Sequence, residues 1–373
     1  MMKKFSDVIQ IVIFMVTIVG LMFAMFILPD KKFSEQENRV LNEAPKFSIK
    51  ALKSGELMKD FEVYLTDQFP MRDEWIGLKS YTEKVSLKTE NNNVFFCDDD
   101  VIIKRFNEPD RALMEKNINA VNKLVESTDV PVYFSLIPGA VSIWSDKLPK
   151  NANVCNQKEL IDEIYSKIGC ETIDNYSVLK KHKDKYIFYK TDHHWTSLGA
   201  YYGHKAVLDA FDLKAKDLSE YSKKCVSDEF YGTVYSSSGV RWVEPDEIDI
   251  YVSDADKVVN KVVGSNLTDG VFYDYEKLKV KDKYAFFFGG NTPLIKITSN
   301  CDNGKKLLVI RDSYSDSEIP FLTEHFSEIY LMDLRYYKFG VQYFLGQFDV
   351  DAILINYSVD NFSEDANVVM IGN

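Results

Sequence analysis

The sequence predicts an α/β protein, a three-layer α/β/α sandwich around a mostly parallel sheet. Short runs that are apolar throughout alternate with helix-length stretches, as is typical of parallel sheets covered on both faces. The 373 residues suffice for one large domain or two smaller ones. Hydrophobic residues make up 46% and charged residues 27% of the chain, which excludes the disordered and fibrous classes.

The first element in chain order is an apolar run from Val8 to Leu28, VIQIVIFMVTIVGLMFAMFIL, which carries no charge. It is long enough to cross a membrane as a helix. A cleaved signal peptide is the alternative, but its apolar region is shorter, and no A-x-A-like site stands before Pro29. We therefore predict an uncleaved signal anchor over residues 8–28.

The charges beside this run bear on its orientation. Lys3 and Lys4 precede it, while Lys31, Lys32 and Arg39 follow it, so the charge count alone leaves the topology open. The short basic leader, residues 1–7, favours a cytoplasmic N-terminus. The expectation is a single-pass protein of the cell membrane with the remaining residues outside the cytoplasm.

Residues 29–80 read as a juxtamembrane and helical region, in which Phe61 to Trp75 forms an amphipathic helix that closes at Phe69-Pro70. The rest, residues 81–373, is the predicted catalytic domain. Its predicted strands are Pro131–Ile137, Tyr186–Lys190, Tyr284–Phe288, Lys306–Ile310, Glu328–Met332 and Ala352–Asn356. Its predicted helices are Arg111–Val125, Gln157–Ile168, Ser197–Phe211 and Gly340–Phe348. Residues 213–283 break this alternation and are predicted to be an insertion that could line a cleft.

Charge and cysteine usage exclude two function classes. Asp and Glu number 57 against 45 Lys and Arg, and the net charge of −12 would repel a phosphate backbone. Nucleic acid is therefore not an expected partner. The five cysteines include no C-x-x-C pair, which argues against a zinc ribbon and a dithiol redox site.

The first motif with chemical content is TDHHWTSLGAYYGH, which begins at Thr191. It follows a predicted strand and precedes a helix that Thr196 could cap. Asp192, His193 and His194 would then lie at the carboxyl end of a strand, where open α/β sheets place their reactive groups. If this segment is extended, Asp192 and His194 face one side and His193 faces the other.

The second motif is KLLVIRDSYSDSEIPFL, in which a buried strand ends and Ser313 stands in the turn that follows. A serine in such a turn projects its hydroxyl beyond the sheet, while backbone N–H groups nearby can stabilise an oxyanion. Turn and cap roles for Ser313, Ser315 and Ser317 are equally reasonable when this motif is taken alone.

The two motifs together supply a nucleophile, a base and an orienting acid. A serine hydroxyl needs a neighbouring base, which needs a third group to hold its tautomer. We therefore predict that Ser313 attacks, His194 takes its proton and Asp192 orients His194. Other substrate or oxyanion candidates are Gly290 and Asn291, after a predicted strand, and also Trp195, Tyr314 and Arg311. For Trp195 a core position is slightly favoured over a sugar-stacking platform.

These residues resemble the DHHW family, named for the tetrad that stands here as Asp192 to Trp195. The resemblance extends to SEQENRVL, DQFPMRD, FFGGNTPLIKI and LLVIRDSYSDSEIPFL. That family is similar to the alginate O-acetylation enzymes, whose fold is an SGNH (GDSL-like) hydrolase domain with circularly permuted motif order. The resemblance implies that Asp192, His194 and Ser313 match the family's Asp, His and nucleophile. Arg311 stands where GDS-type motifs have Gly.

The leading functional hypothesis is a membrane-anchored, extracytoplasmic serine O-acetyltransferase or acetylesterase that acts on a cell-surface polysaccharide through an acetyl-Ser313 intermediate. The triad is the same for both reactions. A transferase would require a multi-pass membrane acyltransferase as acetyl donor, because acetyl-CoA is cytoplasmic. Neither reaction requires a cofactor or a metal.

Two other classes remain open at this point. A metal-dependent phosphoesterase is suggested by the letters DHH and by Asp254 to Asp256, although no D-x-D precedes Asp192 at a strand end. A catalytically degenerate carbohydrate-binding or scaffold protein of the cell envelope is favoured mainly by Arg311.

Overall fold

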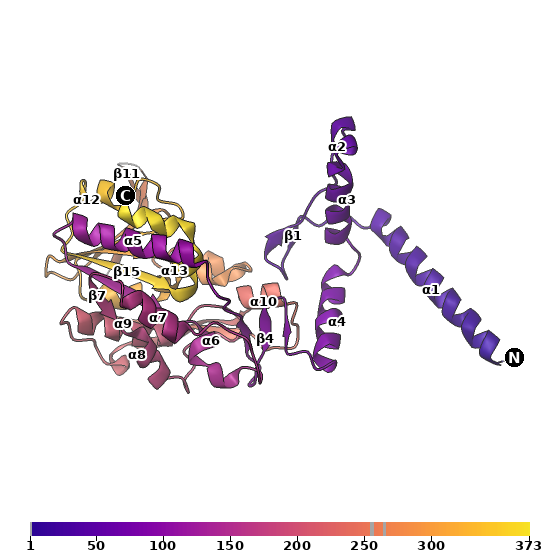
Figure 1. Cartoon of the computed structure of the whole chain (residues 1–373), viewed down its shortest axis with the longest axis horizontal. Helices are drawn as coiled ribbons and strands as arrows, with labels where there is room; N and C mark the ends of the chain where they lie inside the picture. Colours follow the sequence, from indigo (N-terminus) through magenta and orange to yellow (C-terminus); the bar gives the residue numbers. More distant parts are fainter. Residues whose placement is uncertain (1, 254–256, 264–265) are drawn as a thin grey trace. The chain divides into compact units, whose positions relative to one another are not determined.

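The structure is a computed structural model that describes residues 2–253, 257–263 and 266–373, so the run Asp254 to Asp256 lies outside the described residues. The chain folds into two compact units (Figure 1). The N-terminal unit comprises Met1–Lys88 and Ser236–Arg241, and the main unit comprises Thr89–Tyr235 and Trp242–Asn373.

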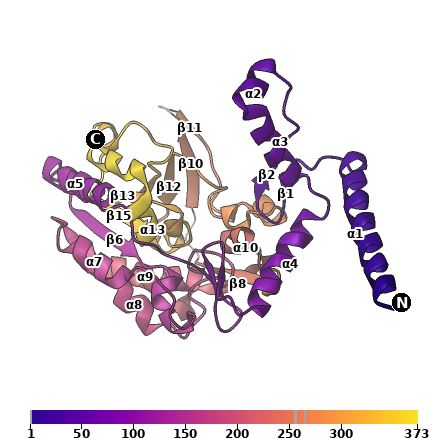
Figure 2. The ribbon, with the colours of Figure 1, turned by 45° about the vertical axis from the view of Figure 1, so that its right-hand side comes forward.

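The main unit is built on an eight-stranded sheet with the order β11-β10-β12-β14-β13-β15-β6-β7 (Figure 2). The strands from β14 to β7 run parallel to their neighbours, while β11, β10 and β12 add antiparallel pairs at one side. The strand bounds are β6 Val132–Ile137, β7 Glu171–Ile173, β10 Lys257–Val263, β11 Asn266–Asp269, β12 Leu294–Ser299, β13 Lys306–Arg311, β14 Glu328–Met332 and β15 Ala352–Ser358. The predicted large, mostly parallel sheet is confirmed.

The inner residues of strand β13, between Lys306 and Arg311, are all apolar, and both faces of the strand are buried there. Leu308 and Ile310 belong to one hydrophobic cluster, and Leu307 and Val309 belong to another. Successive side chains of a strand point to opposite faces, so the two clusters lie on opposite sides of the sheet. This burial explains why the strand shows no alternation of polar and apolar residues.

The longer helices of the main unit begin at polar residues whose side chains accept hydrogen bonds from the first turn. Helix α5, Arg111–Ser127, begins at Asp110, whose carboxylate accepts hydrogen bonds from the Ala112 and Leu113 N–H groups. It packs against α13 and the C-terminal turn, while α8 packs against α9 (Figure 1). The other helices are α6 Ala140–Ile143, α7 Gln157–Tyr165, α8 Asn175–Lys181, α9 Ser197–Ala210, α11 Ile319–Leu322, α12 Val341–Leu345 and α13 Val359–Glu364. Helix α10, Thr233–Ser238, begins in the main unit and ends in the N-terminal unit.

Two smaller sheets accompany the main one. One is formed by β3 Glu90–Asn91, β4 Val94–Phe96 and β5 Ile102–Lys104, and the other by β8 Ser222–Phe230 and β9 Asp246–Val252. Within the 213–283 segment, β8 and β9 form this separate ribbon, whereas β10 and β11 extend the main sheet.

Two predicted strands are absent. Residues 186–190 form a loop, and residues 284–288 include a 3₁₀ turn, Lys283–Phe286. In the first case the Lys190 N–H donates to the Asp246 carboxylate and cannot join a sheet ladder. In the second, Phe286, Phe287 and Phe288 are buried in a hydrophobic cluster without being in a strand. A short apolar run indicates burial and does not by itself specify a strand.

The N-terminal unit contains one long apolar helix, α1 Met2–Ile27, of which Ser6–Ile27 is long and apolar enough to cross a membrane. The unit also contains β1 Phe33–Ser34, β2 Arg39–Val40, α2 Ile49–Ser54, α3 Glu56–Asp67 and α4 Arg72–Val85. The predicted amphipathic helix that closes at Phe69-Pro70 is present as α3, which begins earlier, at Glu56, and ends at Asp67, and a second helix, α4, follows. The chain breaks between α3 and α4 because Pro70 disfavours helical backbone in the residue before it and Met71 has a φ of 57°.

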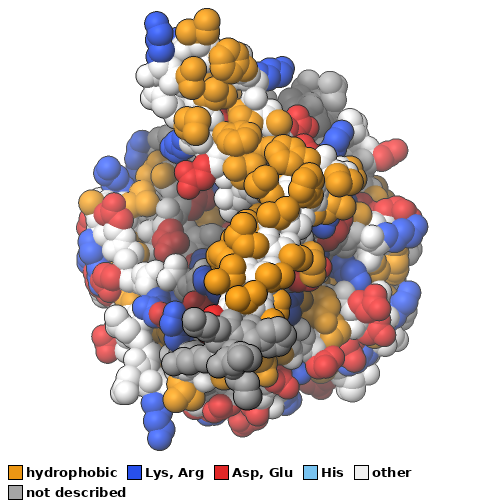
Figure 3. Space-filling view, turned by 90° about the vertical axis from the view of Figure 1, so that its right-hand side faces the viewer, with side chains coloured by type: hydrophobic (Ala, Val, Ile, Leu, Met, Phe, Trp, Pro, Cys, Tyr) orange, Lys and Arg blue, Asp and Glu red, His pale blue; other side chains and the backbone are white. Residues whose placement is uncertain are grey.

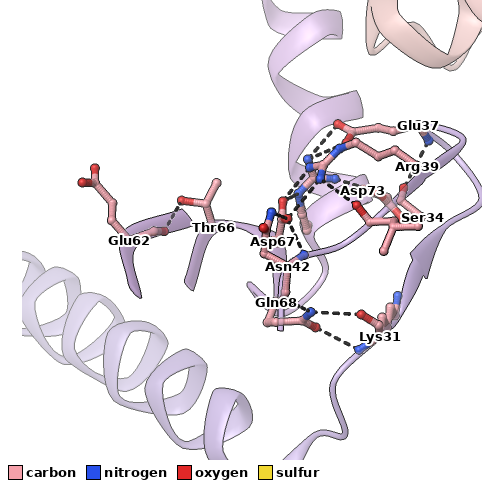
Figure 4. A network of polar contacts seen from close by, with 12 residues as sticks. Lys31, Ser34, Glu37, Arg39, Asn42, Glu62, Thr66, Asp67, Gln68 and Asp73 are labelled. Carbon is pink, nitrogen blue, oxygen red and sulfur yellow. Dashed lines mark hydrogen bonds and ion pairs between the residues drawn. The ribbon is translucent and has the colours of Figure 1, made fainter. Parts of the chain in front are cut away.

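A polar network holds the loops of the N-terminal unit together (Figure 4). Asp67 accepts two hydrogen bonds from the Arg39 guanidinium, at 3.0 and 2.5 Å, and two from Asn42. Glu37 accepts hydrogen bonds from Arg39 and Arg72. The hydrogen bonds from Arg39 outweigh burial and hold the pKa of Asp67 well below its ordinary value. This network connects the SEQENRVL and DQFPMRD segments.

Candidate active site

Ser313 lies in the turn directly after β13, and the Asp312 carboxylate holds this turn. One Asp312 oxygen accepts a hydrogen bond from the Tyr314 N–H at 3.0 Å. The other accepts bonds from the Ser358 N–H at 2.9 Å, the Ser358 hydroxyl at 2.6 Å and the Asn361 side chain at 2.8 Å. Because Ser358 ends the neighbouring strand β15, these bonds tie the turn to the end of the parallel sheet.

Asp192 and His194 lie on a loop that folds back on itself. The Tyr189 N–H donates to the His194 carbonyl at 3.2 Å, and the Thr196 N–H donates to the Ile187 carbonyl at 3.0 Å. The first helix after the loop, α9, begins at Thr196, whose hydroxyl accepts from the Gly199 N–H. We refer to residues 187–196 as the Asp-His hairpin. This hairpin stands where the sequence predicted the carboxyl end of a strand over Tyr186–Lys190.

The hairpin and the turn bring the three predicted catalytic residues together. The Ser313 Oγ lies 2.8 Å from His194 Nε2, and His194 Nδ1 lies 2.5 Å from Asp192 Oδ1. Asp192 and His194 are only 3% and 4% exposed, while Ser313 is partly exposed. A hydroxyl, an imidazole and a carboxylate are thus in hydrogen-bonded succession, with the hydroxyl at the accessible end.

The second oxygen of Asp192 is bound by residues that sequence reasoning missed. The Thr233 N–H and hydroxyl donate to Asp192 Oδ2 at 2.7 and 2.9 Å. Gly232, just before them, approaches so closely that a Cβ there would lie 2.2 Å from the Cβ of Asp192. The Y-G-T sequence at Tyr231 to Thr233 is the only signal of this contact in the chain, and it lies about forty residues from Asp192.

Tyr284 covers His194 and was also missed. Its ring stacks on the imidazole with 3.8 Å between ring centroids and 6° between planes. Its hydroxyl donates to the Ser313 carbonyl at 3.0 Å. Tyr284 therefore contacts both the base and the backbone of the nucleophile, which fixes their relative position. The apolar surroundings also raise the pKa of the Tyr284 hydroxyl well above its ordinary value, so it stays a neutral donor.

The electrostatics leave His194 neutral at neutral pH. Burial lowers the pKa of His194 to about 4, and the adjacent His193 acts in the same direction. Burial opposes charge on Asp192, but the two imidazoles outweigh it and hold the pKa of Asp192 well below its ordinary value. The site therefore combines an ionised carboxylate with an imidazole that is free to accept a proton.

His193 lies closer to the site than an extended segment would place it. Its ring centroid is 3.8 Å from that of His194, and its Nδ1 lies 2.6 Å from the Thr233 hydroxyl. The segment bends at Asp192, so the expectation that the two histidines face opposite sides is wrong. The Tyr314 hydroxyl also binds the His193 carbonyl. Within the described part of the chain, however, no hydrogen bond joins His193 to Ser313.

Three of the predicted substrate or oxyanion residues are buried, and two of these three, Trp195 and Arg311, point away from the site. Trp195 is 0% exposed and its indole N–H donates to the Tyr314 carbonyl at 2.8 Å, so it packs in the core and offers no face to a sugar. Arg311 is 1% exposed and its guanidinium lies 3.0 Å from the Asp316 carboxylate. The Arg311 side chain therefore points into the interior and does not occupy the substrate side of Ser313.

Of the remaining substrate or oxyanion candidates, one contacts the catalytic histidines and two do not. Tyr314 is 4% exposed but contacts both histidines of the site with its ring. Gly290 donates its N–H to the Phe287 carbonyl, and Asn291 is exposed. Among the described residues, no hydrogen bond or ring contact joins Gly290 or Asn291 to the three catalytic candidates, because they precede β12 and do not follow a strand.

A metal centre at this site would compete with the hydrogen bonds that are present. Oxygen and nitrogen atoms of Asp192, His193 and His194 lie within 4.8 Å of one another, as metal ligands would. However, both ring nitrogens of His194 are already engaged, one by Asp192 and one by Ser313. Binding a metal through His194 would break one of these bonds, so the donor set fits a metal poorly.

A serine that follows a parallel strand, hydrogen-bonded to a histidine and through it to an aspartate on a separate hairpin, defines an α/β protein with serine-hydrolase geometry. The chain belongs to the DHHW protein family, whose family model matches residues 110–332, more than half of its length. No curated protein sequence matches the chain.

Solved structures give the same result for the fold. A DHHW family protein from Eubacterium siraeum is 24% identical, with 76% of this chain and 96% of that chain covered and a TM-score of 0.66. PatB1 from Bacillus cereus, solved with a sulfonyl adduct, is 22% identical, with 74% and 98% covered and a TM-score of 0.62. The O-acetyltransferase domain of Pseudomonas putida AlgJ is 13% identical, with 75% and 99% covered and a TM-score of 0.47. The first two likenesses show a shared fold.

Proposed function

We propose that the protein is a serine-dependent O-acetyltransferase or acetylesterase that forms an acetyl ester on Ser313. The observation that carries this proposal is the unbroken series of hydrogen bonds from the Ser313 hydroxyl through His194 to Asp192. A serine without a base is a weak nucleophile, and this arrangement supplies the base and the group that orients it.

In the first half-reaction the Ser313 Oγ attacks the carbonyl carbon of an acetyl ester. His194 Nε2 accepts the serine proton as the new C–O bond forms, and the Asp192 carboxylate stabilises the resulting imidazolium. The same nitrogen then gives this proton to the departing alcohol as the old ester bond breaks. Ser313 now carries the acetyl group, and His194 is neutral again.

In the second half-reaction a hydroxyl compound attacks the acetyl-Ser313 ester. His194 removes the proton of the incoming hydroxyl and returns one to Ser313 Oγ. Water as the acceptor gives an esterase, and a sugar hydroxyl gives a transferase. The two outcomes differ in how well water is kept from the acyl-enzyme, and the triad chemistry is common to both.

The expected acceptor is a cell-surface polysaccharide. One helix of the chain, Ser6–Ile27, is long and apolar enough to span a membrane. Our proposal places the N-terminus in the cytoplasm and the main unit outside it. An acetyl group from a cytoplasmic donor would then have to be delivered by a multi-pass membrane acyltransferase, the partner that a transferase function requires.

The test uses the full chain in phospholipid nanodiscs with p-nitrophenyl acetate. Intact mass and nitrophenol release are compared for the wild type, Ser313→Ala and Ser315→Ala. Ser315 is a buried serine two residues from Ser313, so Ser315→Ala is a matched control for the loss of a serine hydroxyl in the same turn. We expect an adduct with the mass of one acetyl group, and nitrophenol release, in the wild type and in Ser315→Ala only. Equal release from the wild type and Ser313→Ala, with no adduct in either, would contradict the proposal and favour a binding or scaffold role.

A further inference from the structure

Helix α3 is attached to the chain just beyond the apolar segment. The Gln68 side chain at its end exchanges two hydrogen bonds with the Lys31 backbone, both at 2.9 Å (Figure 4). The Tyr64 hydroxyl also donates to Asp30 at 3.0 Å. Lys31 follows the apolar run by only three residues, a reach of about 10 Å even when fully extended. If α1 spans a membrane, the C-terminal end of α3 must therefore lie near its surface.

The two sides of α3 differ in character. Asp67 faces the polar network, where Arg39 and Asn42 satisfy its carboxylate. On the other side the spacing i, i+3, i+7 places Met58, Phe61 and Leu65 in one stripe. Met58 is 61% exposed and Phe61 is 42% exposed, so no element among the described residues covers this apolar stripe.

The stripe is continuous with the end of the membrane helix. Met25, in the last turn of α1, lines one groove of about 720 Å³ together with Met58, Phe61 and Leu65. Phe69, just past the end of α3, extends the groove. Hydrophobic side chains also run along α1 in the space-filling view (Figure 3). The apolar side chains of α1 and α3 therefore share one groove, whose lining also includes the polar side chains of Lys59, Glu62 and Thr66.

We propose that α3 is an interfacial helix, with the stripe of Met58, Phe61 and Leu65 buried in the lipid headgroup and acyl boundary of the membrane that α1 spans. An amphipathic helix lies in this plane when one face is apolar and the other is polar. Lipid is the occupant that the continuity with α1 favours, because the bilayer already surrounds the adjoining end of that helix. The chemistry at Ser313 plays no part in this inference.

The experiment places a photoreactive benzoylphenylalanine at Phe61 in the full chain, reconstituted in phospholipid nanodiscs. The matched control carries the same residue at Asp60, one position along α3 and 100° around the helix, outside the lining of the groove. After irradiation, tryptic peptides are analysed by mass spectrometry for phospholipid adducts. We expect a phospholipid adduct at position 61 at least tenfold more abundant than at position 60.

Equal phospholipid adduct levels at positions 61 and 60, or no phospholipid adduct at position 61, would overturn the proposal. A cross-link from position 61 to a second copy of the chain, or to another protein, would overturn it as well, because the stripe would then be a protein interface. The same comparison with benzoylphenylalanine at Met58 guards against a local disturbance caused by the label at position 61. The proposal requires the lipid adduct at both stripe positions.

Discussion

The two segments that form the catalytic site are each held by one buried carboxylate, but in different ways. Asp312 stands next to Ser313 and binds the end of the neighbouring strand. Asp246 holds the Asp-His hairpin, where it accepts hydrogen bonds from the Lys190 and Thr191 N–H groups, both at 2.8 Å. Asp246 is more than fifty residues away in the sequence. The nucleophile is thus positioned by the sheet, and its base by distant side chains.

This difference shows which part of the site is more easily disturbed. The turn at Ser313 continues a strand that hydrogen bonds to β14 and β15 along its whole length. The hairpin has one isolated bridge, between Phe188 and Trp195, and is otherwise held by single hydrogen bonds with residues far away in the sequence, among them the contacts with Asp246. We therefore expect substitutions around the hairpin to change catalysis more than they change folding.

The largest effect is expected from the triad itself. Ser313→Ala and His194→Ala should each lower kcat for ester turnover by about a thousandfold or more, because triad members act as a unit. Asp192→Asn should lower kcat by a similar factor, because an amide at this position favours the wrong tautomer of the His194 imidazole. Steady-state kinetics with p-nitrophenyl acetate checks all three. A loss of less than tenfold in any of them, with the fold intact by circular dichroism, would show that the hydrogen-bonded series is not the catalytic unit.

The comparison of the two carboxylates is tested directly by Asp246→Ala. The N–H groups of Lys190 and Thr191 and the hydroxyls of Tyr186 and Thr191 would lose their acceptor, and each buried group left unpaired destabilises the fold by about 1–3 kcal/mol. Displacement of the hairpin should lower kcat by about a hundredfold. Thermal unfolding and kinetics are measured on the same preparation, with Glu247→Ala, its exposed neighbour, as the control. If kcat is unchanged while stability falls, the hairpin does not depend on Asp246 for its catalytic position.

A smaller effect is expected from Thr233→Val, which removes one of the two hydrogen bonds to Asp192 Oδ2 but keeps the side-chain shape. The backbone N–H bond remains, so we expect kcat to fall by about tenfold, with KM unchanged. Thr233→Ser keeps the hydroxyl and should restore most of the rate. Loss of activity in both variants would point to packing of the Thr233 methyl group and not to the hydrogen bond.

The smallest change in rate is expected from His193→Ala, which should retain a measurable fraction of activity. Its pH profile is more informative. His194 acts as a base only when neutral, and its pKa is lowered to about 4, so kcat/KM in the wild type should stay level from pH 8 down to about pH 5. His193 contributes to that lowering, so its removal should move the acidic limb to higher pH. A shift to lower pH would contradict the assigned electrostatics.

The sequence was sufficient where local pattern determines structure. The β13 strand, the turn at Ser313, helix α9 after its Thr196 cap and the long apolar helix α1 follow from periodicity, capping and length. The triad members could be named because two motifs supplied complementary chemistry. The three-layer arrangement, the permuted motif order and the domain boundaries within the chain stay predictions.

The rest depends on contacts between residues far apart in the sequence. Nothing local to YIFYK reveals that Asp246 would hold the end of this run in a loop, and nothing near Tyr284 reveals that its ring would stack on His194. Trp195 and Arg311 are candidates for contacts with substrate or oxyanion on sequence grounds alone, because they adjoin the two motifs. Their burial depends on the packing of the core, which the sequence pattern near a motif does not report.

The most direct test of the proposed catalytic series asks whether His194 activates the Ser313 hydroxyl. The full chain in nanodiscs is treated with an aryl sulfonyl fluoride, and the modified residue is located by peptide mass spectrometry. We expect one sulfonyl group per chain, on Ser313, and we expect the rate of this modification to fall at least a hundredfold in His194→Ala. Modification at the same rate in His194→Ala, or modification of other serines with Ser313 left free, would contradict the proposed series.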